Sequence, residues 1–434
     1  MTIWNKKFEC ISPGELEQLQ LERLQSTLNR VSRNVVFYQK IFEREGIIPE
    51  RIRELSDLRR IPFTSRRTLR AAYPYDMFAV PLREVVRLQT SSGTTQEPIV
   101  VGYTRNDVEH WTELVARVLT GAGINRDDVI QISFDYGLFP GALGMHYGAE
   151  AVGASVIPAS TAGSRRQITV MRDFRSTVLI AAPGYGLRLA RMIREMKINP
   201  QDLFLRVGLF GAETWSENLR RELEERLRIK AYDFYGLSEL FNPGVASECE
   251  AQNGLHIFED HFIPEIIDPG TGRPLDFGEE GELVLTSITK EAFPLIRYRT
   301  GDITTLIKGK CSCGRTLVRM ARVKGRTDDM FSVLGVSVFP SQVEEILTRI
   351  EGTEPHFQIR IDREADREVV KLLVEISPEI FSDEMKKMQK LKREIKGEIY
   401  KLLDLEVEVK LVEPGALIGR GEGVRRVIDN RNRG

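Results

Sequence analysis

Residues 88–103, LQTSSGTTQEPIVVGY, are the stretch around which the rest of the chain is organised. Apolar residues at 85, 86 and 88 lead into the polar loop Ser91-Ser92-Gly93-Thr94-Thr95, and an apolar strand at 99–101 leaves it. Gly93 permits backbone angles that other residues avoid, and the hydroxyls and N–H groups of such a loop can wrap an anion. The nucleotide-binding motif G-x-x-x-x-G-K-[ST] is absent. A polar turn without a ligand is the alternative, and the rest of the chain decides between the two.

Length and composition favour an ordinary globular protein. The chain has 434 residues, of which 41% are hydrophobic and 29% charged, so we expect two or three domains. The formal net charge of −1 provides no basic field for nucleic acid. No stretch approaches the roughly 18 apolar residues of a membrane span, and the first 15 residues lack the apolar core of a signal peptide. Four cysteines do not make a secreted disulfide framework. We therefore expect a cytoplasmic protein.

Strands and helices alternate between about residues 105 and 240. Short apolar strands are expected at 129–133, 155–158, 178–181, 207–210 and 231–235, with amphipathic helices between them. This alternation predicts a parallel sheet with helices on its faces, and ligands of such sheets lie beyond the carboxyl ends of the strands. Three sequences follow strands there, namely FDYGLF at 134–139, GAE at 211–213 and YGLSE at 235–239.

The regions on either side of this alternation have different patterns of expected secondary structure. Residues 13–60 are expected to be helical, and residues 255–320 have the short strands and turns of a β-rich subdomain. After residue 328 a compact α+β module is expected, with helices beginning near Pro340 and at about 382. The glycine- and arginine-rich tail from 413 to 434 is expected to be a loop.

Four ordered blocks carry a family resemblance: SSGTT at 91–95, YGLSE at 235–239, YRTGD at 298–302 and GRTDDMFSVLGVSVFPSQVEE at 325–345. Together with TKEAFPLIRYRTGD at 289–302 they resemble the adenylate-forming acyl-CoA synthetases, most closely the phenylacetate–CoA ligases. The resemblance implies an α/β fold with a large N-terminal domain at 1–327, which includes a β-rich subdomain at 250–325. A small mobile α+β domain would follow at 328–434. It also implies a homodimer.

The implied reaction has two halves. A carboxylate of an aryl acid attacks ATP to give acyl-AMP, and coenzyme A then displaces AMP. The residues that would bind the nucleotide and coenzyme A are Ser91, Ser92, Gly93, Thr94, Thr95, Gly211, Ala212, Glu213, Tyr235, Gly236, Ser238, Asp302, Arg326 and Gly335. Thr94, Arg326 and Glu239 would be catalytic, with Glu239 as a Mg²⁺ ligand, because that hard cation prefers carboxylate oxygen. For Glu239 the alternative is a solvated loop carboxylate.

Further roles follow from the same resemblance. Asp328 would be the hinge of the small domain, which presents different faces to one site in the two half-reactions. Tyr136, Phe139, Phe241 and Pro243 would form the walls of the acid pocket, with core packing as the alternative.

The cysteines predict a second site. Cys311 and Cys313 lie in a tight turn, and Cys249 and His256 lie upstream in the same β-rich region. Three cysteines and one histidine form a closed structural zinc set, and some phenylacetate–CoA ligase relatives carry this pattern. Buried free thiols are the alternative.

Several departures from the family pattern affect catalytic positions. Gln96 and Glu97 replace a glycine and a lysine in the phosphate loop. The tail sequence EGVRRVID at 422–429 is one residue short and lacks the lysine that bridges carboxylate and α-phosphate. Loss of such a cation costs roughly 10²–10³ in rate. Two hypotheses therefore stand: an AMP-forming aryl-acid–CoA ligase, or a catalytically impaired homologue that binds nucleotide and acyl groups.

Overall fold

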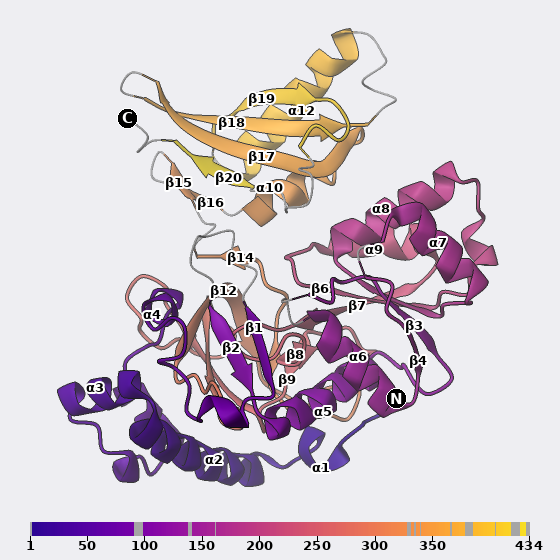
Figure 1. Cartoon of the computed structure of the whole chain (residues 1–434). Helices are drawn as coiled ribbons and strands as arrows, with labels where there is room; N and C mark the ends of the chain where they lie inside the picture. The colour runs from indigo at the N-terminus through magenta and orange to yellow at the C-terminus, as the bar shows by residue number, and fades with distance from the viewer. Residues whose placement is uncertain are drawn as a thin grey trace. The chain divides into compact units, whose positions relative to one another are not determined.

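The computed structural model describes residues 2–90, 99–137, 141–160, 162–327, 331–333, 336–338, 340–364, 367–377, 385–403, 405–417 and 426–430. It divides into two compact units (Figure 1). The first unit comprises Met1–Glu213 and Leu223–Arg322, and the second comprises Thr214–Glu222 and Val323–Gly434.

A parallel sheet with the predicted alternation of strands and helices forms the centre of the first unit. Its strands are β3 (Val129–Ile132), β4 (Ser155–Ile157), β5 (Val178–Ala181), β6 (Val207–Gly211) and β7 (Lys230–Tyr235), in the order β4-β3-β5-β6-β7. The helices are α5 (Arg105–Gly121), α6 (Gly141–Val152), α7 (Ser164–Asp173) and α8 (Pro183–Glu195). Helix α9 (Glu217–Leu227) precedes β7, and its residues up to Glu222 are assigned to the second unit. Helices α5 and α6 lie side by side, as do α7 and α8 (Figure 1). Every residue of β5 and β6 is buried, as expected for strands covered on both faces.

Antiparallel strands extend this sheet beyond β7, and they form the predicted β-rich subdomain. They follow in the order β8 (Ala246–Ser247), β9 (Leu255–Ile257), β13 (Arg319–Met320), β12 (Tyr298–Ile307), β11 (Glu280–Ser287) and β10 (Phe262–Ile267). A separate antiparallel pair, β1 (Arg87–Thr90) and β2 (Val100–Tyr103), flanks the predicted phosphate loop. The loop itself, at 91–95, lies outside the described residues.

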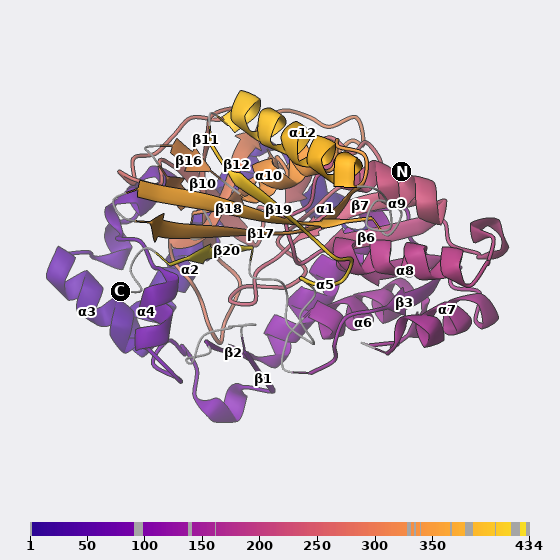
Figure 2. The same cartoon turned by 90° about the horizontal axis from the view of Figure 1, so that it is seen from above.

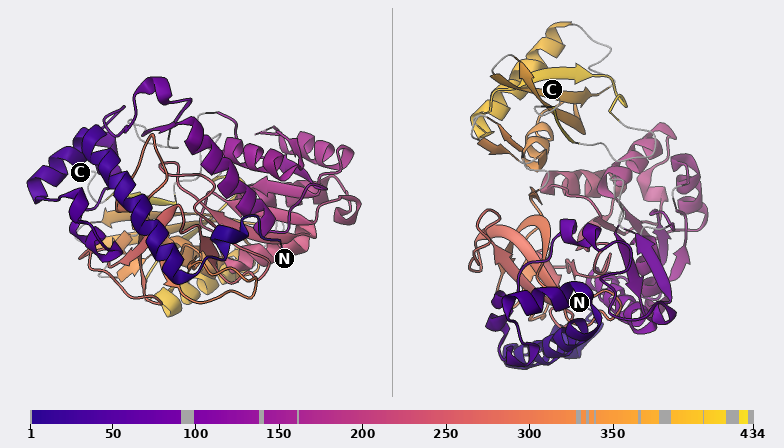
Figure 3. Two further views of the ribbon diagram at one scale, coloured as in Figure 1. Left: turned by 90° about the horizontal axis from the view of Figure 1, so that it is seen from below. Right: turned by 60° about the vertical axis from the view of Figure 1, so that its left-hand side comes forward.

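The N-terminal helices are α1 (Lys6–Glu9), α2 (Pro13–Asn34), α3 (Val36–Glu45) and α4 (Arg66–Ala71), and short 3-10 helices lie at Pro49–Arg51, Leu55–Arg60 and Leu82–Glu84. A further 3-10 helix, Pro200–Asp202, lies between α8 and β6. Helix α2 begins with a capping box between Ser12 and Glu15. Figure 3 shows α2 running along the antiparallel part, where Gln20 donates a hydrogen bond of 2.9 Å to the carbonyl of Glu259. The predicted helical region thus packs on the subdomain.

The second unit has its own core. A four-stranded sheet has the order β19 (Glu408–Val412), β18 (Arg367–Ile376), β17 (Thr353–Glu364) and β20 (Val427–Asp429). The other elements are β14 (Gly325–Arg326), β15 (Phe331–Val333), β16 (Val336–Val338), α10 (Pro340–Leu347) and α12 (Met385–Leu403). Helix α12 lies along this sheet (Figure 2), and its Ile395 and Ile399 are buried against strand residues.

The expectation that the tail is a loop is wrong at residues 427–429. Val427–Asp429 forms β20, which pairs in parallel with Ile359–Ile361 of β17. Arg426, just before this strand, donates two hydrogen bonds of 2.7 and 2.9 Å to the carboxylate of Glu344. A long-range strand partner and a bidentate ion pair order the segment, and neither is visible in local composition.

Candidate functional site

Two of the predicted blocks meet at the carboxyl-terminal edge of the parallel sheet. Strand β7 ends at Tyr235, and the Tyr235 hydroxyl donates a hydrogen bond of 2.5 Å to Oδ2 of Asp302 in β12. Asp302 is buried, and its backbone N–H donates to Oγ1 of Thr300 at 3.0 Å. YGLSE and YRTGD are therefore joined by side chains, at the edge where ligands of parallel sheets bind.

The GAE sequence emerges at the same edge from the neighbouring strand. Gly211 ends β6 opposite Phe234 of β7, and a Cβ at this position would lie 2.6 Å from the Phe234 carbonyl oxygen. Ala212 has a φ of +68°, in the left-handed region, so the chain turns sharply here. The Glu213 carboxylate accepts a hydrogen bond of 2.8 Å from the backbone N–H of Gly184. Close backbone contact and this carboxylate anchor fix the turn.

Glu239 is a buried carboxylate, since only 3% of its surface is exposed. Its Oε1 lies 3.7 Å from Nε of Arg66. The neighbouring Ser238 is at the limit of burial, and the Gly236 backbone approaches the Phe241 carbonyl so closely that a Cβ would lie 2.5 Å from it. A solvated loop carboxylate, the alternative considered above, does not describe these surroundings, whereas the Mg²⁺ role remains a prediction.

The buried Lys290 contacts the backbone of the loop that carries Glu239. Lys290 has 1% of its surface exposed and donates a hydrogen bond to the carbonyl of Leu240. Its Nζ lies 4.1 Å from the ring centroid of Tyr103 and 4.8 Å from that of Phe241. Burial lowers the pKa of Lys290 to about 7, and the carboxylates of Asp107 and Glu239 oppose that shift. Neither Lys290 nor Arg66 was predicted from the sequence as a residue of the site. The apolar run after Lys290 is the signal that could have indicated its burial.

The predicted walls of the acid pocket have mixed surroundings. Phe241 is fully buried, with ring centroids 6.2 Å from Tyr103 and 6.5 Å from Trp111. Pro243 follows a cis peptide bond, and its carbonyl accepts a hydrogen bond of 2.7 Å from Trp111 Nε1. Tyr136 is partly exposed, and its hydroxyl oxygen lies 3.2 Å from Nδ1 of His146. Core packing describes the environment of Phe241, and a role of these residues in binding the acid stays a prediction.

The four predicted metal ligands form one buried cluster. The ligand atoms of Cys249, His256, Cys311 and Cys313 all lie within 4.8 Å of one another. The Sγ atoms of Cys249 and Cys311 are 3.8 Å apart, and Cys313 Sγ is 3.5 Å from His256 Nε2. Tetrahedral zinc with Zn–S of about 2.3 Å and Zn–N of about 2.0–2.1 Å requires S···S of about 3.8 Å and S···N of about 3.5 Å. The residues therefore fit zinc, and the sulfur separation excludes a disulfide in this structure.

Further polar contacts surround this cluster. Arg315, in the same turn as Cys313, donates a hydrogen bond of 2.5 Å to the buried carboxylate of Glu9. The backbone N–H of Thr316 donates to the Glu9 carbonyl at 3.1 Å. Burial, with Arg315 and Arg319 nearby, lowers the pKa of His256 to about 3, so its ring is neutral as a metal ligand requires. The cluster thus also anchors the N-terminal segment.

Several residues that were predicted to form the site are outside the described residues, and one, Arg326, belongs to the second unit. Phe139, Asp328, Gly335 and the loop 91–95 are outside the described residues, as are tail residues 422–425. Arg326 lies in β14 of the second unit.

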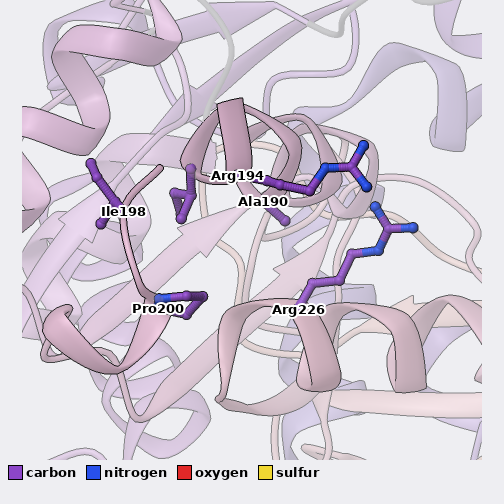
Figure 4. Close-up of a pocket in the computed structure, with 6 residues that line it drawn as sticks. Ala190, Arg194, Ile198, Pro200 and Arg226 are labelled. Atoms are coloured by element: carbon purple, nitrogen blue, oxygen red, sulfur yellow. The ribbon is translucent and has the colours of Figure 1, made fainter. Parts of the chain in front are cut away.

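A cavity of about 300 Å³ lies at the opposite edge of the parallel sheet (Figure 4). Ala190, Arg194, Ile198, Pro200 and Arg226 are among its lining residues, and the side chains of Arg194 and Arg226 extend toward each other. Pro200 precedes β6 and Arg226 precedes β7, so this cavity is separate from the site at the carboxyl ends. Arginines in the last turns of α8 and α9 are also favoured by the helix dipole alone.

Comparisons with known proteins match nearly the full length of the chain. Residues 16–289 match the family model "AMP-binding enzyme", and residues 335–431 match "AMP-binding enzyme C-terminal domain". The phenylacetate-coenzyme A ligase of Escherichia coli is 44% identical over 427 residues, which cover 98% of this chain and 97% of the relative. The enzyme of the same name from Thermus thermophilus is 42% identical, covering 99% of this chain and all of the relative.

A solved structure agrees. The crystal structure of 2-hydroxyisobutyryl-CoA ligase in the postadenylation state, in complex with 2-HIB-AMP, has a TM-score of 0.92 and 27% identity, covering 99% of this chain and 92% of that one. The chain therefore belongs to the AMP-binding, adenylate-forming enzymes. Within them it is a member of the phenylacetate–CoA ligase family, as the sequence blocks predicted. None of the described helices is long and apolar enough to cross a bilayer.

Proposed function

We propose that this protein is an AMP-forming ligase that joins an arylacetic acid, with phenylacetate as the first candidate, to coenzyme A. Relatives bearing the phenylacetate–coenzyme A ligase name are 42–44% identical over nearly the full chain. Within the structure, the proposal rests on the hydrogen bond that joins Tyr235, at the carboxyl end of β7, to Asp302, and on the burial of Glu239 in the loop that follows β7.

The proposed reaction has two balanced steps. In the first, a carboxylate oxygen of the acid forms a bond to the α-phosphorus of ATP, and the bond to the bridging oxygen of the leaving pyrophosphate breaks. In the second, the thiolate of coenzyme A attacks the acyl carbon, the C–S bond forms, and the bond to AMP breaks. Phosphoryl transfer depends mainly on positioning and on charge stabilisation.

The residues of this chain have the following proposed roles. Asp302, oriented by the Tyr235 hydroxyl, accepts hydrogen bonds from the ribose hydroxyls. Glu239 holds Mg²⁺, which when bound neutralises charge on the phosphates. Gly211, Ala212 and Glu213 line the adenine and acyl-carboxylate region. The segment 91–95, Arg326, the Asp328 hinge and Gly335 keep the roles that the family resemblance gives them.

The metal cluster has a structural role in this proposal. Cys249, His256, Cys311 and Cys313 hold one Zn²⁺, and four protein ligands leave no open position for water or substrate. The separations of the ligand atoms support this assignment. A homodimer and a cytoplasmic location complete the proposal.

Exchange of labelled pyrophosphate into ATP over a panel of aryl and arylacetic acids tests the first step. Thioester formation with coenzyme A, followed by mass spectrometry, tests the second. We expect both with phenylacetate or a close analogue. Binding of ATP without exchange, and without consumption of a supplied acyl-adenylate, would favour the impaired homologue, which no contact among the described residues supports.

A further inference from the structure

Arg66 contacts the proposed metal ligand, although no sequence block contains it. Its Nε lies 3.7 Å from Oε1 of Glu239, and the two side chains differ in exposure. The Glu239 side chain is 4% exposed, whereas that of Arg66 is 37% exposed. The guanidinium therefore approaches a buried carboxylate from the solvent side, where a nucleotide would have to enter.

The backbone before Arg66 is fixed against the strand that carries Asp302. The N–H of Thr64 donates to the Arg297 carbonyl at 3.0 Å, and the N–H of Arg299 donates to the Thr64 carbonyl at 2.9 Å. Thr64 forms an isolated parallel bridge with Tyr298, and its buried hydroxyl donates to the Ile296 carbonyl at 2.7 Å. Ser65 then caps α4. Arg66 thus follows an anchored backbone and has a side chain that is partly exposed to solvent.

The other groups near Glu239 provide little positive charge for binding phosphate, so Arg66 is a candidate for this role. Lys290 is buried and donates a hydrogen bond to the Leu240 carbonyl, so its ammonium group is not available to bind a nucleotide that enters from solvent. The sequence SSGTTQEP at 91–98 has no basic residue and one acidic residue, Glu97. A further cation that supplements Mg²⁺ at a triphosphate bound here would therefore have to come from another segment of the chain.

We propose that Arg66 binds the β- and γ-phosphates of ATP, which leave as pyrophosphate, and that it pairs with Glu239 when no nucleotide is bound. The inference rests on the proposed role of Glu239 as a Mg²⁺ ligand. If Glu239 holds Mg²⁺, as proposed above, the phosphate oxygens bound to the same ion would lie close to the Glu239 carboxylate. Nε of Arg66 already lies 3.7 Å from Oε1 of that carboxylate. If Glu239 held Mg²⁺, its carboxylate would no longer pair with Arg66, and the guanidinium would be free to donate to phosphate oxygens, for which its planar fork is suited.

The test compares Arg66→Gln with Arg66→Lys and with Arg67→Gln. Arg67 is the exposed next residue, so its variant removes the same charge without touching Glu239. We expect Arg66→Gln to raise the KM values for ATP and for pyrophosphate in the exchange reaction by about 10- to 100-fold, the range for a lost charged hydrogen bond. Arg66→Lys should restore part of this loss, and Arg67→Gln should match the parent.

The second half-reaction separates a ligand role from a structural one. Thiolysis of a supplied acyl-adenylate by coenzyme A involves no pyrophosphate, so we expect Arg66→Gln to keep the parent's rate within about twofold. Unchanged KM values for ATP and pyrophosphate would overturn the inference, as would an equal loss in both half-reactions. If the parent itself shows no exchange with any acid, the proposed function fails. Calorimetric binding of Mg·ATP to the parent and Arg66→Gln then tests Arg66 alone, and equal affinities would refute its role.

Discussion

Replacing Cys311 by serine removes one of the four ligand atoms of the metal cluster. The sulfur of Cys311 lies 3.8 Å from that of Cys249, as two ligands of one tetrahedral zinc do. Structural zinc contributes about 10–16 kcal/mol of apparent binding free energy in small domains, so one of four ligands accounts for about 3 kcal/mol. This corresponds to roughly a hundredfold loss of zinc affinity. We therefore expect Cys311→Ser to lose zinc to a chelator that the parent resists.

The N-terminal segment supplies a second readout. The Arg315–Glu9 ion pair and the Thr316 hydrogen bond attach this segment to the turn that carries Cys311 and Cys313. Loss of metal should loosen the turn, lower the temperature of unfolding and expose the first dozen residues to protease. Cys10→Ser is the matched control, because Cys10 is outside the cluster.

Metal analysis of the purified chain measures zinc before and after dialysis against graded chelators. Parent protein that contains no zinc, or Cys311→Ser that retains it as well as the parent, would refute the assignment. If metal removal abolished both half-reactions while the unfolding temperature and protease resistance stayed unchanged, the site would not be structural.

Three other predictions concern the reaction site. Glu239→Gln is expected to keep the fold and weaken Mg²⁺-dependent use of ATP, because it removes an anionic oxygen ligand; equal thermal stabilisation of variant and parent by Mg·ATP would contradict this. A lysine inserted before Val424 is expected to raise adenylation by about one to two orders of magnitude, measured by pyrophosphate exchange, and to leave thiolysis unchanged. The pKa of Lys290 is lowered by burial to about 7 from 10.5, so the unfolded chain binds more protons between these values. The parent should therefore gain stability relative to Lys290→Met as the pH rises above about 7, by at most about 1.4 kcal/mol per unit, and denaturant unfolding at several pH values measures this difference. A difference independent of pH would show that Lys290 keeps its ordinary titration.

Local periodicity was sufficient to predict the parallel core. Each strand from β3 to β7 is a short apolar run between amphipathic helices, and both signals depend only on neighbouring residues. Pairings over long distances were not predictable in this way. The local pattern predicts one strand-like stretch at residues 256–267, yet this region is divided between β9 and β10, which lie far apart in the sheet order. Strand β20 was missed because its partner, β17, lies more than sixty residues upstream.

The same distinction separates the predicted from the missed residues of the site. Asp302, Glu239 and the Cys/His cluster belong to sequence motifs in which the type of residue indicates its chemical role. Arg66 lies in the sequence FTSRRTLR, where three arginines look equivalent and any of them suits an exposed helix surface. The contacts of Thr64 with residues 296–299, made across more than two hundred residues, fix the backbone before Arg66, and Arg66 pairs with Glu239. Charge at the phosphate site is therefore a property of the tertiary structure. It follows that the loss of a lysine at position 97 cannot be judged from the loop sequence alone, because an arginine from another part of the chain can supply the missing charge.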